Sequence, residues 1–282
     1  MAEFSQKTSN PEPINNKKNK RKGLLSLPND DKRKIIFVAT LLSLVSSILV
    51  STAAIKLRPL QESNAQYFRK FEILKVAGLL PVQGDMESYF SNNIQTKIVN
   101  LASGQYTKEI NPETFDERKA ARADSTSMAL PAHQDIAGIK RRSNYMRVYL
   151  VPDQQGKPVK IILPVHGYGL WSTLYGFLAL NADGRTIAGL TFYEQAETAG
   201  LGAEITNPKW LAQFPGKHAI DKQGKPVIRV NKGVVNPSSK DKNHLVDGIS
   251  GATLTSNGVT NLMHFWLGEL GFGPYLATLG NY

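Results

Sequence analysis

The sequence predicts an α+β protein in which a single N-terminal transmembrane helix precedes a domain built on a mostly antiparallel sheet. Three observations predict it: one long apolar run near the N-terminus, short β-rich runs separated by turns beyond Asn144, and a helical pattern near the C-terminus. The β-rich runs follow one another directly. They do not alternate with helices, which argues against a doubly wound parallel sheet.

The apolar run covers residues 35–55 and contains no charge and no proline. A helix of about 21 residues reaches ~31 Å, which matches the hydrocarbon core of a bilayer. A signal peptide would have a shorter apolar region and a clear cleavage site after it, so we interpret the run as an uncleaved anchor.

Charges beside the span predict its orientation. Within about eighteen residues of the span, eight Lys and Arg residues precede it (17, 18, 20, 21, 22, 32, 33 and 34) and four follow it (56, 58, 69 and 70). The positive-inside rule therefore places the N-terminus in the cytoplasm and the C-terminal domain outside the bacterial inner membrane, in the periplasm. The basic cluster at 17–22 lacks aromatic residues that could stack on bases, so a membrane partner is favoured and nucleic acid is not.

Further elements follow in order. Apolar residues at helical spacing predict a helix over 60–80, with Pro59 as a kink before it, and a second helix over 114–124. Strands are predicted for YMRVYLV (145–151), KIILPV (160–165) and TIAGLTFYE (186–194), and a C-terminal helix is predicted from the spacing of Val259, Leu262, Trp266 and Leu270.

The composition excludes several kinds of site. The chain has no cysteine, so it contains no disulfide, thiol nucleophile, iron–sulfur cluster or zinc–thiolate centre. Its five histidines never fall at the i, i+4 spacing of a helical metal site, and no metal site is predicted. Redox chemistry in this chain would need a bound organic cofactor.

The most informative segment is DGISGATLTS (247–256), which directly precedes the C-terminal helix. Its glycines allow a close approach of the backbone, its hydroxyls can bond or be esterified, and the start of a helix favours an anion. A common alternative is a serine or threonine cap on a buried helix. A serine hydrolase is disfavoured because the nucleophile-elbow pattern lacks its final glycine.

DGISGATLT resembles the D-G-x-[ST]-G-A-T-x-[ST] signature of the FMN-binding domain family, in which a flavin transferase esterifies the last hydroxyl residue to the flavin phosphate. The resemblance implies covalent FMN on Thr255, with no catalytic residue beyond the flavin itself. It also implies that Ser250, Gly251, Ala252 and Thr253 contact the cofactor.

Two other segments fit the same resemblance. Glycines precede Leu170 and Trp171, which could cover the flavin ring, and ETAGLG (197–202) resembles the family's E-T-x-G-L-G element, which implies contacts from Glu197, Thr198, Leu201 and Gly202. Core packing is the alternative for Trp171 and Leu201. Lys232 could neutralise the phosphate, although a solvated lysine is also typical of such a loop.

The resemblance divides the chain into a basic cytoplasmic tail (1–34), the transmembrane helix (35–55), a membrane-proximal helical or mixed region (56–140) and an FMN-binding domain (141–282). From residue 35 onward the chain is similar to the family of C subunits of sodium-translocating NADH:quinone oxidoreductases. That similarity implies an electron-transfer subunit of a sodium-exporting respiratory complex. It also implies partners: a second FMN-carrying membrane subunit and the iron–sulfur, NADH-oxidising subunits.

Two alternatives to this interpretation remain. The first is the family of G subunits of Rnf-type electron transport complexes, which shares the motif and the topology. The second is a membrane-anchored extracytoplasmic binding module that carries no redox cofactor.

Overall fold

The computed structural model describes residues 24–279, and the basic cluster at 17–22 lies outside them. The chain divides into two units, residues 1–62 and 63–282. A short 3-10 helix η1 (Leu24–Ser26) precedes a single long helix α1 (Lys32–Ala77) that contributes to both units.

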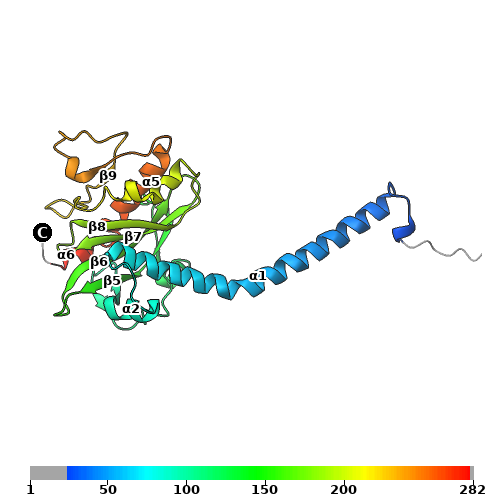
Figure 1. Ribbon diagram of the computed structural model, residues 1–282, viewed down its shortest axis with the longest axis horizontal. Helices are drawn as coiled ribbons and strands as arrows, with labels where there is room; N and C mark the ends of the chain where they lie inside the picture. The colour runs from blue at the N-terminus through cyan, green and yellow to red at the C-terminus, as the bar shows by residue number, and fades with distance from the viewer. Residues whose placement is uncertain (1–23, 280–282) are drawn as a thin grey trace, which may run out of the picture. The chain divides into compact units, whose positions relative to one another are not determined.

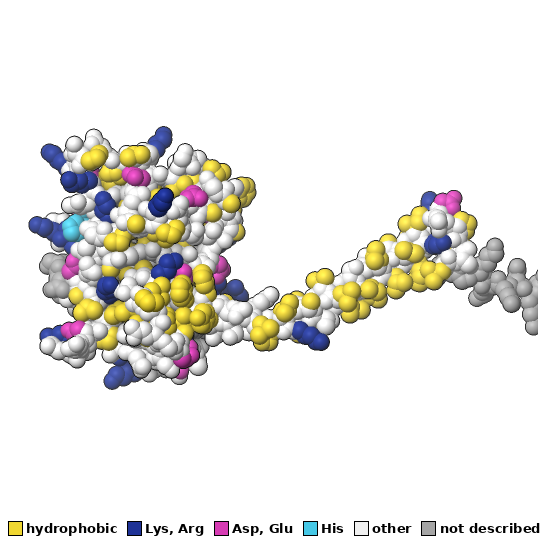
Figure 2. Space-filling model, in the orientation of Figure 1, with side chains coloured by type: hydrophobic (Ala, Val, Ile, Leu, Met, Phe, Trp, Pro, Cys, Tyr) yellow, Lys and Arg dark blue, Asp and Glu magenta, His cyan; other side chains and the backbone are white. Residues whose placement is uncertain are grey.

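Helix α1 is long and apolar enough to cross a membrane. Most of its large apolar side chains between Ile35 and Ile55 are exposed, and hydrophobic side chains line the helix in Figure 2. The predicted helix over 60–80 and the predicted transmembrane helix, with Pro59 as a kink between them, are parts of one helix, α1, which contains Pro59. Proline removes one hydrogen bond of a helix, and the turns on either side keep theirs.

The second unit is built on a six-stranded antiparallel sheet with the order β2-β1-β5-β6-β7-β8, of which Figure 1 labels β5 to β8. The strands are β1 (Gln95–Asn100), β2 (Tyr106–Thr107), β5 (Tyr145–Pro152), β6 (Pro158–Tyr168), β7 (Thr173–Asn181) and β8 (Ile187–Glu194). The predicted strands at 145–151, 160–165 and 186–194 are confirmed. The predicted α+β class, with one apolar N-terminal helix before an antiparallel sheet, is also confirmed.

Smaller elements complete this unit. The helices are α2 (Met86–Asn93), α3 (Glu117–Ala120), α4 (Pro208–Leu211), α5 (Thr253–Leu267) and α6 (Gly273–Ala277), with 3-10 turns η2 (Asp124–Thr126), η3 (Gly202–Thr206) and η4 (Lys242–His244). Two-stranded sheets pair β3 (Ser127–Ala129) with β4 (Arg141–Ser143), and β9 (Arg229–Val230) with β10 (Leu245–Val246). The helix expected over 114–124 is only four residues long, and Asp116 sets its start by accepting a hydrogen bond from the Lys119 N–H.

Both faces of the sheet are covered. Alternate residues of a strand point to opposite faces, so β6 sends Ile161 and Leu163 into the core beneath α5, whereas Ile162 packs with the last turns of α1 and with α2. Helix α5 supplies Val259, Leu262, Met263 and Trp266 to the first core, each fully buried. The predicted C-terminal helical pattern is therefore confirmed, and the start of α5 is held firmly against β6.

Candidate functional site

The motif segment is anchored just before α5 by Asp247. The Asp247 carboxylate accepts a hydrogen bond from the Val235 N–H (2.7 Å), its own N–H donates to the Gln213 side chain (2.9 Å), and its carbonyl accepts from the Trp210 indole (2.8 Å). Gly248 then packs on the neighbouring loop, where a Cβ would lie 2.3 Å from the Asn231 carbonyl oxygen. These contacts fix the direction in which the chain enters the helix.

Helix α5 starts without a side-chain cap. Its N-cap residue is Ala252, and among the described residues no side chain bonds the helix N-terminus. The first backbone N–H groups of any helix lack partners within it, so those of Thr253, Leu254 and Thr255 remain available to an anion. The serine or threonine cap considered as an alternative is wrong: the hydroxyls of the motif are not used that way.

Thr255 and Glu197 form the centre of the site. The Thr255 hydroxyl donates to Glu197 Oε2 over 2.5 Å, and both side chains are buried, with exposed fractions of 0% and 8%. Charge-assisted O–H···O bonds of this length are among the stronger hydrogen bonds in proteins. The next residue, Ser256, has a buried hydroxyl that lacks a hydrogen-bond partner within the described part of the chain.

Glu197 is oriented by the turn that follows β6. The N–H groups of Leu170 and Trp171 donate to Glu197 Oε1 over 3.1 and 3.0 Å, and the Leu170 N–H also lies 3.3 Å from Oε2. A Cβ on Gly169 would lie 2.7 Å from Oε1, and one on Gly202 would lie 2.6 Å from the Thr255 hydroxyl. Glycine at both positions lets the backbone enclose the carboxylate and the hydroxyl.

We call the turn 169–171, the loop 197–202 and the start of α5 together the Thr255 site. Apolar side chains around it face solvent: Trp171 is 64% exposed, Leu254 59%, Leu201 42% and Leu170 38%. Core packing, the alternative for Trp171 and Leu201, is therefore excluded. A group of exposed apolar side chains on a folded surface commonly marks a binding site.

The remaining predicted residues lie around this centre with different exposures. Thr198, Ser250, Gly251 and Thr253 are exposed, and Ala252 is buried. Gly251 adopts a left-handed conformation (φ 71°), and a Cβ there would lie 2.8 Å from Leu201 Cδ2. Lys232 is exposed on the loop that Gly248 contacts through its N–H bond to the Gly233 carbonyl oxygen (2.9 Å). The structure thus brings Leu170, Trp171, Glu197, Gly202 and Thr255 into direct contact, and it shows no such contact for Lys232.

Packing residues that support the site were not predicted from the sequence. Gly258 in α5 lies against the turn after β6, where a Cβ would be 2.6 Å from the Tyr168 carbonyl oxygen. The Trp266 indole donates to the His166 carbonyl oxygen (2.6 Å), and the His166 ring stacks on Tyr175. Burial, assisted by the charge of Arg118, lowers the pKa of His166 to about 4. A glycine inside an apolar helix was the available signal for close packing at Gly258.

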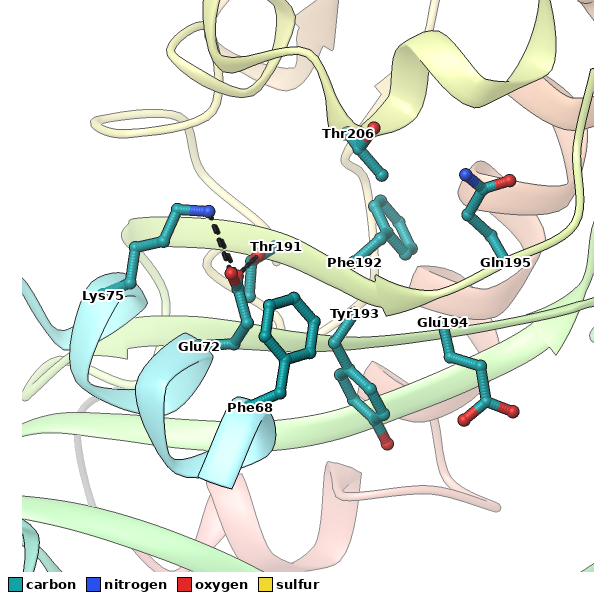
Figure 3. Close-up of a pocket in the computed structure, with 9 residues that line it drawn as sticks. All are labelled: Phe68, Glu72, Lys75, Thr191, Phe192, Tyr193, Glu194, Gln195 and Thr206. Carbon is teal, nitrogen blue, oxygen red and sulfur yellow. Dashed lines mark hydrogen bonds and ion pairs between the residues drawn. The ribbon is translucent and has the colours of Figure 1, made fainter. Parts of the chain in front are cut away.

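A separate cavity of about 510 Å³ lies where the end of α1 meets β8 (Figure 3). Its walls include the buried carboxylate of Glu72, which bonds the Thr191 hydroxyl and the Lys75 ammonium group (3.1 Å to the latter). The lining also includes Gln195, whose side chain accepts the Glu197 N–H over 2.6 Å. The cavity thus borders the residue that positions Glu197, but it contains neither Thr255 nor Glu197.

Chemically, the Thr255 site can receive an anion at the uncapped helix start, hold a flat apolar group against its exposed rim, and offer one buried hydroxyl to a reactive group. Residues 169–268 match the family model described as the FMN-binding domain. This range contains the whole Thr255 site. The fold and the site define a flavoprotein domain of the FMN-binding class, and the helix that precedes it, α1, is long and apolar enough to cross a membrane.

Whole-chain comparisons narrow this class. The C subunit of the Na(+)-translocating NADH-quinone reductase from Pseudomonas aeruginosa is 48% identical over 249 residues, covering 87% of this chain and 95% of that protein. The corresponding protein from Yersinia pestis is 45% identical over 251 residues, with 88% and 93% covered. The chain belongs to the family of Na(+)-translocating NADH-quinone reductase C subunits.

Solved structures agree with this conclusion. The crystal structure of Shewanella oneidensis NqrC has a TM-score of 0.69 and 37% identity, covering 76% of this chain and 96% of that one. The C subunit from Parabacteroides distasonis has a TM-score of 0.58 and 28% identity, with 80% and 98% covered. The relatives named here favour this family over the Rnf-type G subunits, and the match to an FMN-binding domain argues against a module without a cofactor.

Proposed function

We propose that this chain carries FMN as a phosphoester on Thr255 and relays electrons within a sodium-exporting NADH:quinone reductase complex. The electrons would come from NADH-derived redox centres on partner subunits and pass toward quinone. A flavin transferase would attach the cofactor. The observation that carries the proposal is the meeting of a buried threonine hydroxyl with the uncapped start of α5.

The residues present fit FMN in three ways. A phosphate on Thr255 would lie at the helix N-terminus, where the backbone N–H groups and the helix dipole favour negative charge. The unpartnered Ser256 hydroxyl is a further polar atom at this helix end. Trp171, Leu201 and Leu254 offer apolar surface for the flat ring, and glycine at 251 and 202 allows the backbone to lie closer to Leu201 and to the Thr255 hydroxyl than a Cβ would permit.

FMN supplies the electron-transfer chemistry, and the protein's residues hold and insulate it. A covalent link prevents loss of the cofactor into the surroundings and restricts where the ring can lie. The backbone N–H groups of Leu170 and Trp171 fix Glu197 beside the attachment point, and the exposed rim leaves one side of the site open to a redox partner.

The attachment is tested by the intact mass of the full chain expressed with its flavin transferase and analysed under denaturing conditions. We expect the wild type to gain the mass of FMN minus water. Thr255→Ser keeps a hydroxyl at the same position and should also gain it, whereas Thr255→Ala should not. An unmodified wild type beside a demonstrably active transferase would refute the flavin attachment, and modification of Thr255→Ala would refute the position.

The orientation in the bacterial inner membrane is part of the same proposal, with the N-terminus in the cytoplasm and the FMN-binding domain on the periplasmic side. The chain contains no cysteine, so a single introduced cysteine reports accessibility without background. In intact spheroplasts, a membrane-impermeant maleimide should label Ser238→Cys, which lies on an exposed loop, and should not label Asp30→Cys. The reverse labelling would refute the orientation.

A further inference from the structure

We infer that Glu197 acts as the general base for its own chain's flavin attachment, by accepting the proton of the Thr255 hydroxyl as the phosphoester forms. This inference rests on the proposed attachment of FMN at Thr255. It gives the receiving protein a chemical part in the modification beyond that of a passive acceptor.

The geometry is that of a base already bonded to its nucleophile. Thr255 Oγ1 donates to Glu197 Oε2 over 2.5 Å, within the reach that proton transfer requires. The two backbone N–H groups from the 169–171 turn bond mainly to Oε1, which leaves Oε2 directed at the hydroxyl. Oε2 is therefore the carboxylate oxygen placed to accept the Thr255 proton.

Orientation is fixed from the other side as well. The Glu197 N–H donates to Gln195 Oε1, so both its backbone and its side chain are held. The following residues, 198–201, are all exposed, and Gly200 adopts φ 74°. Gly202, which directly follows this segment, lies against the Thr255 hydroxyl, so a phosphate reaches Thr255 when this part of the loop moves, while Glu197 stays anchored to the 169–171 turn.

The chemistry requires such a base because a threonine hydroxyl is a weak nucleophile until its proton is removed. The co-reactant is a flavin dinucleotide, in which the FMN phosphate is joined to AMP through a phosphoanhydride. The new bond joins Thr255 Oγ1 to the FMN phosphorus, and the P–O bond to AMP breaks with its electron pair leaving on AMP. The proton passes to Glu197 and then to solvent, and nothing is oxidised or reduced.

A purely structural role for Glu197 makes different predictions from a base. Glu197→Gln keeps the size of the side chain and can still bond the Thr255 hydroxyl, but it cannot accept a proton. Glu197→Asp keeps the carboxylate at a shorter reach. The test uses full-length, flavin-free chain in detergent, purified transferase and flavin adenine dinucleotide, with the rate of FMN mass gain as the readout.

A general base typically raises a reaction rate by ~10²- to 10⁴-fold. We therefore expect Glu197→Gln to gain FMN at least ~100-fold more slowly than the wild type, and Glu197→Asp at a rate between the two. The ratio of the Gln rate to the wild-type rate should rise as the pH is lowered, because only the wild type loses its base on protonation. Taking this ratio at each pH cancels the transferase's own pH dependence. Near-UV circular dichroism checks that each variant is folded.

A wild-type rate and an unchanged pH dependence in Glu197→Gln would overturn the inference while leaving the attachment at Thr255 intact. Absence of modification in the wild type would instead refute the proposed function. If Glu197→Gln fails to fold, the comparison of Glu197→Asp with the wild type decides: equal rates with identical pH profiles overturn the inference.

Discussion

Replacing Gly258 with alanine tests whether the packing of α5 on the turn after β6 sets the geometry of the site. In an exposed helix interior, glycine to alanine stabilises by up to ~1 kcal/mol. Here the new Cβ would lie 2.6 Å from the Tyr168 carbonyl oxygen and 3.1 Å from Gly169 Cα, both backbone atoms. Neither atom can turn aside as the end of a side chain could, so α5 must shift.

Overpacking of this kind costs typically ~1–3 kcal/mol, and the contact is short enough to expect the upper part of that range. After subtracting the helix gain of ~1 kcal/mol, the net loss of unfolding free energy is about 2 kcal/mol. For a folded unit of this size that corresponds to a fall in Tm of ~4–8 °C.

The assay is thermal unfolding of the full chain in detergent, followed by near-UV circular dichroism so that the sheet domain is observed. Asn257→Ala is the matched control, because it also introduces alanine, with a smaller helix gain, at an exposed neighbour on α5 and should leave Tm unchanged or slightly raised. A Gly258→Ala protein as stable as Asn257→Ala would refute the conclusion that this contact is tight.

Three further predictions concern other parts of the domain. Glu72→Ala should lower the free energy of unfolding by ~1–3 kcal/mol, because it leaves the buried Thr191 hydroxyl unpaired. The control Glu62→Ala removes an exposed ion pair with Arg58 and should change the free energy of unfolding little. Chemical denaturation of the two variants measures the difference. The pKa of His166 is lowered to about 4 from 6.5, so the unfolded state binds a proton at this histidine more readily than the folded state does. As the pH falls from 6.5 to 4, the free energy of unfolding of the wild type should therefore decrease by up to ~3 kcal/mol. His166→Gln should flatten that slope in pH-dependent denaturation, and an unchanged slope would contradict the assignment. Trp171→Ala should shift the absorption of bound flavin while Tm stays the same, since the indole is 64% exposed; a large fall in Tm would mean that it packs in the core.

The sequence predicted the elements whose signal lies within one short stretch of neighbouring residues. The apolar run at 35–55 and the β-rich runs at 145–151 and 186–194 are defined by neighbouring residues alone, and α1, β5 and β8 follow them. Strand β7 was not predicted because it is central and apolar on both faces, so it lacks alternation, and Gly176 interrupts it. The predicted helix over 60–80 is the C-terminal part of α1, because one proline inside a helix does not end it when the turns on either side keep their hydrogen bonds.

The sequence predicted which segments form the candidate site, but it did not predict how their side chains lie relative to one another. The motif around Thr255 and the Glu197 segment were each identified from their residues. Their meeting at 2.5 Å depends on the connection from β8 to η3, which brings residues 58 apart in the sequence together. No local pattern contains that distance, and for this reason a proton-accepting role for Glu197 could only be inferred from the structure.

Helix α5 contains, in its first turn, the threonine proposed to carry the flavin, and its last residues Trp266 and Leu267 are buried in the core. A nascent chain in which this helix has not yet packed has no Gly169 turn against Gly258 and no carboxylate beside Thr255. With attachment at Thr255, covalent flavin would accumulate only on chains that have completed their fold. The fraction of chains that carry covalent flavin would then equal the fraction that had folded when the transferase acted. Partner subunits that bind only the flavin-carrying chain would thereby exclude unfolded chains from the complex.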